Sequence, residues 1–180
     1  DWFFKDEAGQ LPSRELMLEQ MRTHIDTVVG RYKGRIQYWD VVNEAVLHQG
    51  AGNSAKLRES PWFKAIGEDY IELAFRHTHA VDPDAKLYYN DYNMTKKEKV
   101  DFVLEMVSGM RAKGVPIHGV GMQGHWMLEW PSLSDIEYAL RIFADAGIPV
   151  SITELDITVL PDPPSHSGAN VTDDVEYAEK

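Results

Sequence analysis

Polar and ionisable residues follow four short segments of this chain that are rich in β-forming side chains. The residues at the four segment ends are Asn43-Glu44, then Asn90-Asp91-Tyr92-Asn93, then Gln123 and His125, and finally Glu154 and Asp156. A single carboxylate at such a place is most simply explained as a salt bridge or a helix cap, because an unpaired buried charge is costly. Four segment ends of the same character instead predict a functional site.

Glu44 and Glu154 come from different segments and suit the cleavage of a glycosidic bond. In that reaction one protonated carboxyl group helps the leaving oxygen to depart, while an ionised one attacks the anomeric carbon. Their surroundings must therefore favour opposite protonation states. His125 could lie between Glu154 and Asp156 and keep that nucleophile ionised, and the Asn43 amide could hold a sugar hydroxyl.

Aromatic residues near the same segment ends suit the flat faces of sugar rings. They are Tyr89, Tyr92, Trp126 and Trp130.

Other kinds of catalytic chemistry find less support. His77 and His79 are two residues apart in an expected helix and cannot share a face, so we expect no metal site. The chain lacks a Gly-x-Ser-x-Gly motif, which argues against a serine hydrolase of the nucleophile-elbow type. Cysteine is absent, which excludes a thiol nucleophile and disulfides, and no cofactor is implied.

The elements that position these residues alternate between strand and helix. We expect strands over 36–43, 86–90, 117–123 and 150–154, and helices over 13–34, 66–81, 97–113 and 134–146. Ser13 is expected to cap the first helix, whose apolar stripe is Met17, Met21, Ile25 and Val28. Ser134 is expected to open the last helix with a capping box.

A short device occurs twice, as GVPI at 114–117 and GIPV at 147–150. The glycine ends one helix, and the proline keeps the start of the next strand out of a helical conformation. Repeated strand–helix units predict a parallel sheet with helices packed outside it. Spacing of about 37 residues per unit suits an eightfold barrel, and a doubly wound sheet fits nearly as well, although no G-x-G-x-x-G follows a strand.

The composition of the chain limits the kinds of molecule that we expect it to bind. The chain has 180 residues, of which 43% are hydrophobic and 26% charged, as in a folded globular domain. Its net charge of −11 argues against nucleic acid as a partner. No apolar run approaches the roughly 18 residues of a membrane span, so no membrane partner is expected.

Two longer segments carry a resemblance: WDVVNEA at 39–45 and ITELDI at 152–157. They are similar to the two signature segments of the family 10 glycoside hydrolases, the endo-β-1,4-xylanases. The resemblance continues through SPW at 60–62, GEDYI at 67–71, NDYN at 90–93 and GVGMQGH at 119–125. It covers nearly the whole chain, from Trp2 to about Leu160.

The resemblance implies a (β/α)8 barrel and a retaining mechanism by double displacement. Glu44 would be the general acid and then the base, Glu154 the nucleophile, and Asn43 would hold the sugar 2-hydroxyl. His125 would bind Glu154 with Asp156 as its support. Further sugar-binding residues would be Gln123, Tyr92 and Asn90. A retaining geometry predicts about 5–5.5 Å between the two carboxyl groups.

The resemblance also implies what this chain contains. Residues 1–180 would be part of a catalytic domain, with about strands four to seven of the barrel and without the first three and the eighth. Two unpaired sheet edges would favour aggregation or a need for the missing segments. The expected partners are xylan or xylo-oligosaccharides, complementary barrel segments and attached carbohydrate-binding modules, in a secreted, extracellular or periplasmic protein. Two alternatives stay open: a β-glucanase or cellulase of the same clan, and a non-catalytic carbohydrate-binding fragment.

Overall fold

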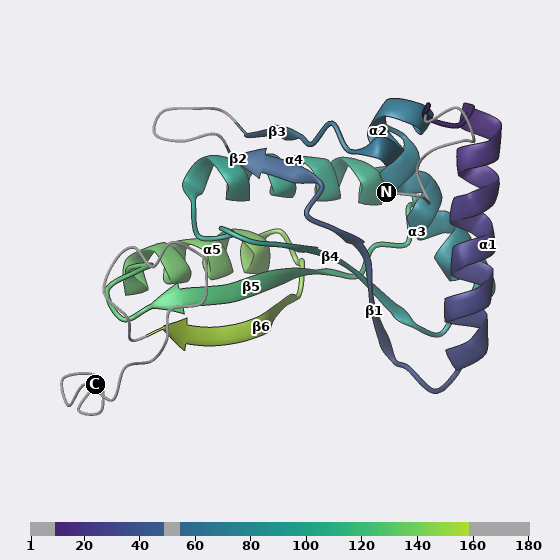
Figure 1. Ribbon diagram of the computed structural model, residues 1–180. Coiled ribbons are helices and arrows are strands. Elements are labelled where there is room, and N and C mark those ends of the chain that lie inside the picture. The colour runs from purple at the N-terminus through teal and green to yellow at the C-terminus, as the bar shows by residue number, and fades with distance from the viewer. Residues whose placement is uncertain (1–9, 49–54, 159–180) are drawn as a thin grey trace, which may run out of the picture.

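The computed structural model describes residues 10–48 and 55–158 (Figure 1). Its elements, in chain order, are α1 (Arg14–Tyr32), β1 (Tyr38–Asn43), β2 (Val46–His48), β3 (Ala55–Leu57), α2 (Pro61–Ile66), α3 (Tyr70–Val81), β4 (Lys86–Asp91), α4 (Lys97–Ala112), β5 (Gly119–Met127), α5 (Leu133–Asp145) and β6 (Val150–Thr158). No helix among these residues is long and apolar enough to cross a membrane.

The main sheet has four parallel strands in the order β1-β4-β5-β6 (Figure 1). The spatial order follows the chain order, without the reversal that defines the switch point of a doubly wound sheet. This strand order favours a barrel over a doubly wound sheet, and the four described strands form part of the barrel wall. Parallel strands also place all four carboxyl ends at one edge, as the sequence predicted.

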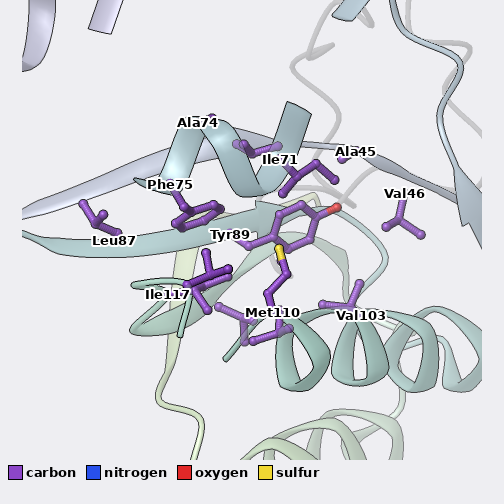
Figure 2. Close-up of a cluster of buried hydrophobic side chains, with 14 of the residues drawn as sticks. Ala45, Val46, Ile71, Ala74, Phe75, Leu87, Tyr89, Val103, Met110 and Ile117 are labelled. Atoms are coloured by element: carbon purple, nitrogen blue, oxygen red, sulfur yellow. The ribbon is translucent and has the colours of Figure 1, made fainter. Parts of the chain in front are cut away.

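The core lies where β4 packs against helices α3 and α4. Leu87 and Tyr89 of β4 and Phe75 of α3 are completely buried. Figure 2 shows these side chains in one cluster with Val103 and Met110 of α4. This apolar layer packs helices against the sheet and fixes the position of β4. The last two residues of β4, Asn90 and Asp91, lie at the carboxyl edge of the sheet.

The outer strands are less well covered. On β6, Leu155 is 59% exposed and Ile157 53% exposed, and Tyr38 of β1 is 62% exposed. Within residues 10–48 and 55–158, β1 and β6 each have one edge that pairs with no other strand. Apolar side chains beside open edges are typical of a surface that another segment covers.

Helix α1 follows the sequence closely, with one correction. The Ser13 hydroxyl accepts a hydrogen bond from the Leu16 amide at 3.3 Å, which confirms the cap. The buried stripe ends in Val29 rather than the predicted Val28. The buried residues of α1 are four positions apart throughout, from Met17 to Val29. The prediction ended the stripe with a spacing of three, which also keeps residues on one face of a helix.

The helix predicted over 66–81 begins later, as α3 at Tyr70, and a separate helix, α2, precedes it over Pro61–Ile66. Pro61 follows the Ser60 cap and starts α2, and Gly67 ends it with φ of 104° before α3 begins at Tyr70. The serine–proline start was a helix signal that the prediction missed.

The last helix also begins earlier than predicted. Ser132, not Ser134, is its cap, since the Ser132 hydroxyl accepts from the Asp135 amide at 3.2 Å. Ser134 lies inside the first turn. Both serines precede acidic residues by a suitable spacing, and only the backbone conformation at Ser132 distinguishes them.

All four predicted strands need changed bounds. Strand β1 begins at Tyr38 rather than 36, and β4 ends at Asp91 rather than 90. Strand β5 begins at Gly119 rather than 117 and continues to Met127, and β6 continues to Thr158, because these two strands pair with each other beyond the predicted site edge. The antiparallel pair β2–β3 was not predicted, since three residues per strand are too few for a periodic pattern. The glycine–proline devices are confirmed: Gly114 and Gly147 have φ of 70° and 64°.

Gly121 of β5 offers a test of how tightly the site edge is packed. A Cβ atom at this position would lie 2.3 Å from the Asn90 Oδ1 atom, so Gly121→Ala must displace the buried Asn90 side chain. We expect this substitution to lower the free energy of unfolding by about 1–3 kcal/mol in a denaturant titration. Gly109→Ala is the matched control, because a Cβ atom on this α4 residue meets nothing within 4 Å. Equal stability of both variants would contradict the packing described.

Candidate active site

The two glutamates lie at opposite sides of the sheet's carboxyl edge. Glu44 follows β1 and Glu154 lies within β6. Both have left-handed backbone conformations, with φ of 55° and 52°. For a residue with a Cβ atom this conformation costs on the order of 1–3 kcal/mol, and such residues cluster at functional sites.

A β-bulge places the Glu154 side chain. Gln123 of β5 pairs with Thr153, and His125 pairs with Asp156, so two residues of β6 stand opposite Gly124 alone. The extra residue bends the strand and redirects the side chain at the bulge. Glycine suits position 124 because a Cβ atom there would lie 2.7 Å from Leu155 Cδ1 and 3.3 Å from Leu155 Cα.

Three amide side chains connect the two glutamates. Gln123 Nε2 donates to Glu44 Oε1 at 3.2 Å and is 3.1 Å from Asn43 Oδ1. Asn90 Nδ2 donates to the same Asn43 oxygen at 3.0 Å and to Glu154 Oε1 at 2.7 Å. This chain of hydrogen bonds, which we call the amide bridge, crosses the sheet from β1 to β6 and fixes the two carboxylates relative to each other.

The structure assigns Asn90 a position different from the predicted one. Asn90 is only 2% exposed, and Thr153 Oγ1 donates to its Oδ1 at 2.6 Å. Both ends of the amide are thus occupied by protein groups. Asn90 was predicted as a sugar-binding residue, whereas the structure packs its side chain inside the sheet edge, where Gly121 leaves room for it.

His125 lies between two carboxylates, as predicted. Its Nδ1 is 2.6 Å from Asp156 Oδ2 and its Nε2 is 3.1 Å from Glu154 Oε2. The hydrogen bond to Asp156 is the main cause that raises the pKa of His125 above its ordinary value; partial burial opposes it and the bond to Glu154 adds to it. A protonated ring donates from both nitrogens, so His125 can orient both carboxylates at once.

A further carboxylate, Asp40, lies near Glu154 and was not predicted as a site residue. Asp40 of β1 has its pKa raised by burial and, second, by the negative charge of Glu154. Asp40 lies within the WDVVNEA segment, on the strand that leads to Glu44. That position is the sequence signal that points to it.

A hollow of about 870 Å³ opens beside Glu44. Glu44, Gln123 and His125 line it together with the aromatic rings of Tyr92, Trp126 and Trp130. A polar floor with aromatic walls suits a sugar chain, because the rings present flat apolar faces. Tyr89 was predicted to belong to these aromatics and does not: it is completely buried and donates to Asp91.

Two cations behind Glu44 also escaped prediction. Arg58 Nε donates to the Glu44 carbonyl oxygen at 2.7 Å. Lys99 is completely buried and pairs with buried Asp91 at 2.6 Å, and burial lowers the pKa of this lysine. Tyr92 lies between the two, since its hydroxyl accepts from Arg58 and its ring lies 3.8 Å from Lys99 Nζ.

No group of three or more His, Asp or Glu side chains that could hold a metal ion occurs within residues 10–48 and 55–158. Fold and site together define a class: parallel βα barrels with two carboxylates at the carboxyl ends of their strands, the arrangement of barrel glycoside hydrolases. The chain matches the family model of Glycosyl hydrolase family 10 over residues 1–178, and it belongs to that family.

Similar proteins agree. The chain is 44% identical over 176 residues to endo-1,4-beta-xylanase A of Xylanibacter ruminicola, covering 98% of this chain and 46% of the relative. It is 47% identical over 158 residues to an endo-1,4-beta-xylanase of Geobacillus stearothermophilus, covering 88% of this chain and 47% of the relative. The crystal structure of xylanase XynB from Paenibacillus barcinonensis matches 99% of this chain and 53% of its own, at a TM-score of 0.87 and 40% identity.

The chain thus spans about half the length of the relatives that it matches. The resemblance to family 10 is confirmed, and so is the (β/α)8 fold of that family, of which the described sheet contains four parallel strands, β1, β4, β5 and β6. The assignment of these strands as the fourth to the seventh of the barrel stays a prediction.

The raised pKa of His125 can be measured directly. We expect an NMR titration of the histidine rings to give His125 a pKa above the ordinary value of about 6.5. Asp156→Asn removes the main cause and should lower it. His118, whose pKa is lowered by burial and which lies away from Asp156, is the internal control and should not change. An unaltered His125 titration in the variant would show that Asp156 does not set the charge of this ring.

Proposed function

We propose that the protein containing this chain is an endo-acting, retaining β-1,4-xylanase. Glu44 serves as the general acid and base, and Glu154 as the nucleophile. The observation that carries the proposal is the amide bridge, which ties one oxygen of each glutamate into a single hydrogen-bonded chain. Two carboxylates held as a pair are what double displacement at a sugar requires.

In the first step the Glu154 carboxylate attacks the anomeric carbon of the sugar. The glycosidic bond breaks as Glu44 gives its proton to the leaving oxygen, and a covalent glycosyl-enzyme forms. Asn90 and His125 each approach one oxygen of Glu154, at 2.7 Å and 3.1 Å, so the nucleophile is oriented at both oxygens.

In the second step a water molecule attacks the same carbon from the face that the leaving group vacated. Glu44, now ionised, takes the proton of this water, and the bond from the sugar to Glu154 breaks. Gln123 Nε2 donates to Glu44 Oε1 and holds the carboxylate in place through both steps. Asn43, which lies between the glutamates in the amide bridge, would hold the sugar 2-hydroxyl, and its contacts with Asn90 and Gln123 support this role.

The relatives support xylan as the substrate class. Several similar proteins are named as endo-1,4-beta-xylanases. Xylanase 10B from Thermotoga petrophila, 42% identical at a TM-score of 0.76, was solved with xylobiose, and TsXylA of Thermoanaerobacterium saccharolyticum, 38% identical, with xylotriose as its E146A mutant. The aromatic residues Tyr92, Trp126 and Trp130 beside the glutamates offer surfaces for sugar units beyond the cleaved bond.

Substitution of the glutamates tests the proposal. In the full-length protein, we expect Glu154→Gln to lower the release of reducing sugar from xylan by on the order of 10⁴-fold, because no other group can form the covalent intermediate. Glu44→Ala should lower it by about 10²–10⁴-fold. Glu137→Gln on α5, whose exposed side chain pairs with Arg141, is the matched control and should retain activity.

Retained xylan binding in the inactive Glu154→Gln variant would show that catalysis, not folding, was lost. The same assay on carboxymethylcellulose separates a xylanase from a β-glucanase. Full activity of Glu154→Gln would exclude the proposed nucleophile, and a wild-type protein that binds xylan without cleaving it would indicate a binding module.

A further inference from the structure

Arg58 contacts the proposed acid–base residue without taking part in the chemistry described above. It follows β3, fourteen residues after Glu44 along the chain, and its side chain is 35% exposed. Its guanidinium makes three contacts within the site. Nε donates to the Glu44 carbonyl oxygen at 2.7 Å, while one terminal nitrogen is 3.1 Å from the Tyr92 hydroxyl and 3.7 Å from Glu44 Oε2.

The contact to the main chain is the informative one. Glu44 has a left-handed backbone, which a residue with a Cβ atom adopts only when its surroundings hold it there. Its amide donates to the Asn90 carbonyl oxygen at 2.9 Å, and its carbonyl accepts from Arg58 Nε. Arg58 thus supplies one of the two hydrogen bonds that fix the peptide units on either side of this residue.

Arg58 is itself held from the buried side. The Tyr92 hydroxyl accepts from it, and the Tyr92 ring lies over the Lys99 ammonium at 3.8 Å. Lys99 and Asp91 are both completely buried and form an ion pair at 2.6 Å. A planar guanidinium can donate in two directions at once, to the Glu44 carbonyl and to the Tyr92 hydroxyl, which a lysine ammonium at the end of a flexible chain cannot reproduce.

The side-chain contacts of Arg58 are not needed to hold β2 and β3 together. The main-chain amide of Arg58 already donates to the Ala45 carbonyl at 2.7 Å, and the two strands pair through their own backbones. A substitution of the Arg58 side chain leaves these bonds in place, so the side chain is free to serve the orientation of Glu44.

We propose that Arg58 is a positioning residue that holds Glu44 in its left-handed conformation and aims its carboxyl group at the leaving oxygen. This inference rests on the proposed function of Glu44. It predicts a specific defect: loss of Arg58 weakens proton donation to the leaving group and leaves the attack by Glu154 intact.

The dependence of the rate on the leaving group tests this role. A dinitrophenyl group departs without a proton, whereas a phenyl group needs the general acid, so kcat/KM for the two aryl β-xylobiosides separates acid catalysis from nucleophilic attack. In the full-length protein, we expect Arg58→Met to lower kcat/KM about 10–100-fold for the phenyl substrate and less than about 3-fold for the dinitrophenyl one. Arg58→Lys should restore only part of the loss.

Two controls make each outcome decisive. Glu44→Ala must show the same selective loss on the phenyl substrate in a larger measure; if it does not, the proposed function of Glu44 fails. Arg141→Met, in an exposed pair on α5, should leave both rates unchanged. If Glu44→Ala is selective and the Arg58 variants lose activity on both substrates equally, or on neither, the positioning role is overturned. Arg58→Lys keeps the test available if Arg58→Met does not fold.

Discussion

The hydrogen bonds of the Asn90 amide hold the two sides of the site together. Asn90 lies on β4, one of the two central strands, and donates to Asn43 on β1 and to Glu154 on β6. Its oxygen accepts from Thr153, so the amide orientation is fixed by a donor at one end and acceptors at the other. Because a buried amide that loses its partners costs free energy, this arrangement resists any movement of one glutamate relative to the other.

This constraint explains the unusual local structure around it. Glycine stands at position 121 because a side chain there would collide with Asn90, and both glutamates adopt left-handed backbones that turn their carboxylates toward the bridge. On the β6 side His125 adds a second contact to Glu154. On the β1 side Arg58 holds the Glu44 main chain. The strain at two residues is thus compensated by hydrogen bonds from several strands, as is usual at sites whose geometry must be exact enough for chemistry.

The sequence allowed much of this to be predicted, because the signals were local. Strand–helix alternation, the Ser13 cap and the two glycine–proline devices depend on neighbouring residues alone. The polar residues at the strand ends pointed to the two glutamates and to a histidine between two carboxylates, His125 between Glu154 and Asp156. Features that depend on contacts between residues far apart in the sequence were not predictable. Tyr89 is buried by α3 and α4, and the Asn90 side chain packs inside the sheet edge. Arg58 contacts Glu44 because the pairing of β2 with β3 brings the two residues together.

The central claim is that Glu154 forms a bond to the sugar while the amide bridge and His125 orient it. A fluorinated xylobioside that forms the glycosyl-enzyme quickly and releases it slowly would trap that state, and mass spectrometry of peptides would locate the attached sugar. The account predicts one glycosyl unit per protein molecule on the peptide that contains Glu154, and none in Glu154→Gln. A sugar attached to a different carboxylate, or rapid turnover with no covalent adduct under conditions that stop the second step, would contradict it.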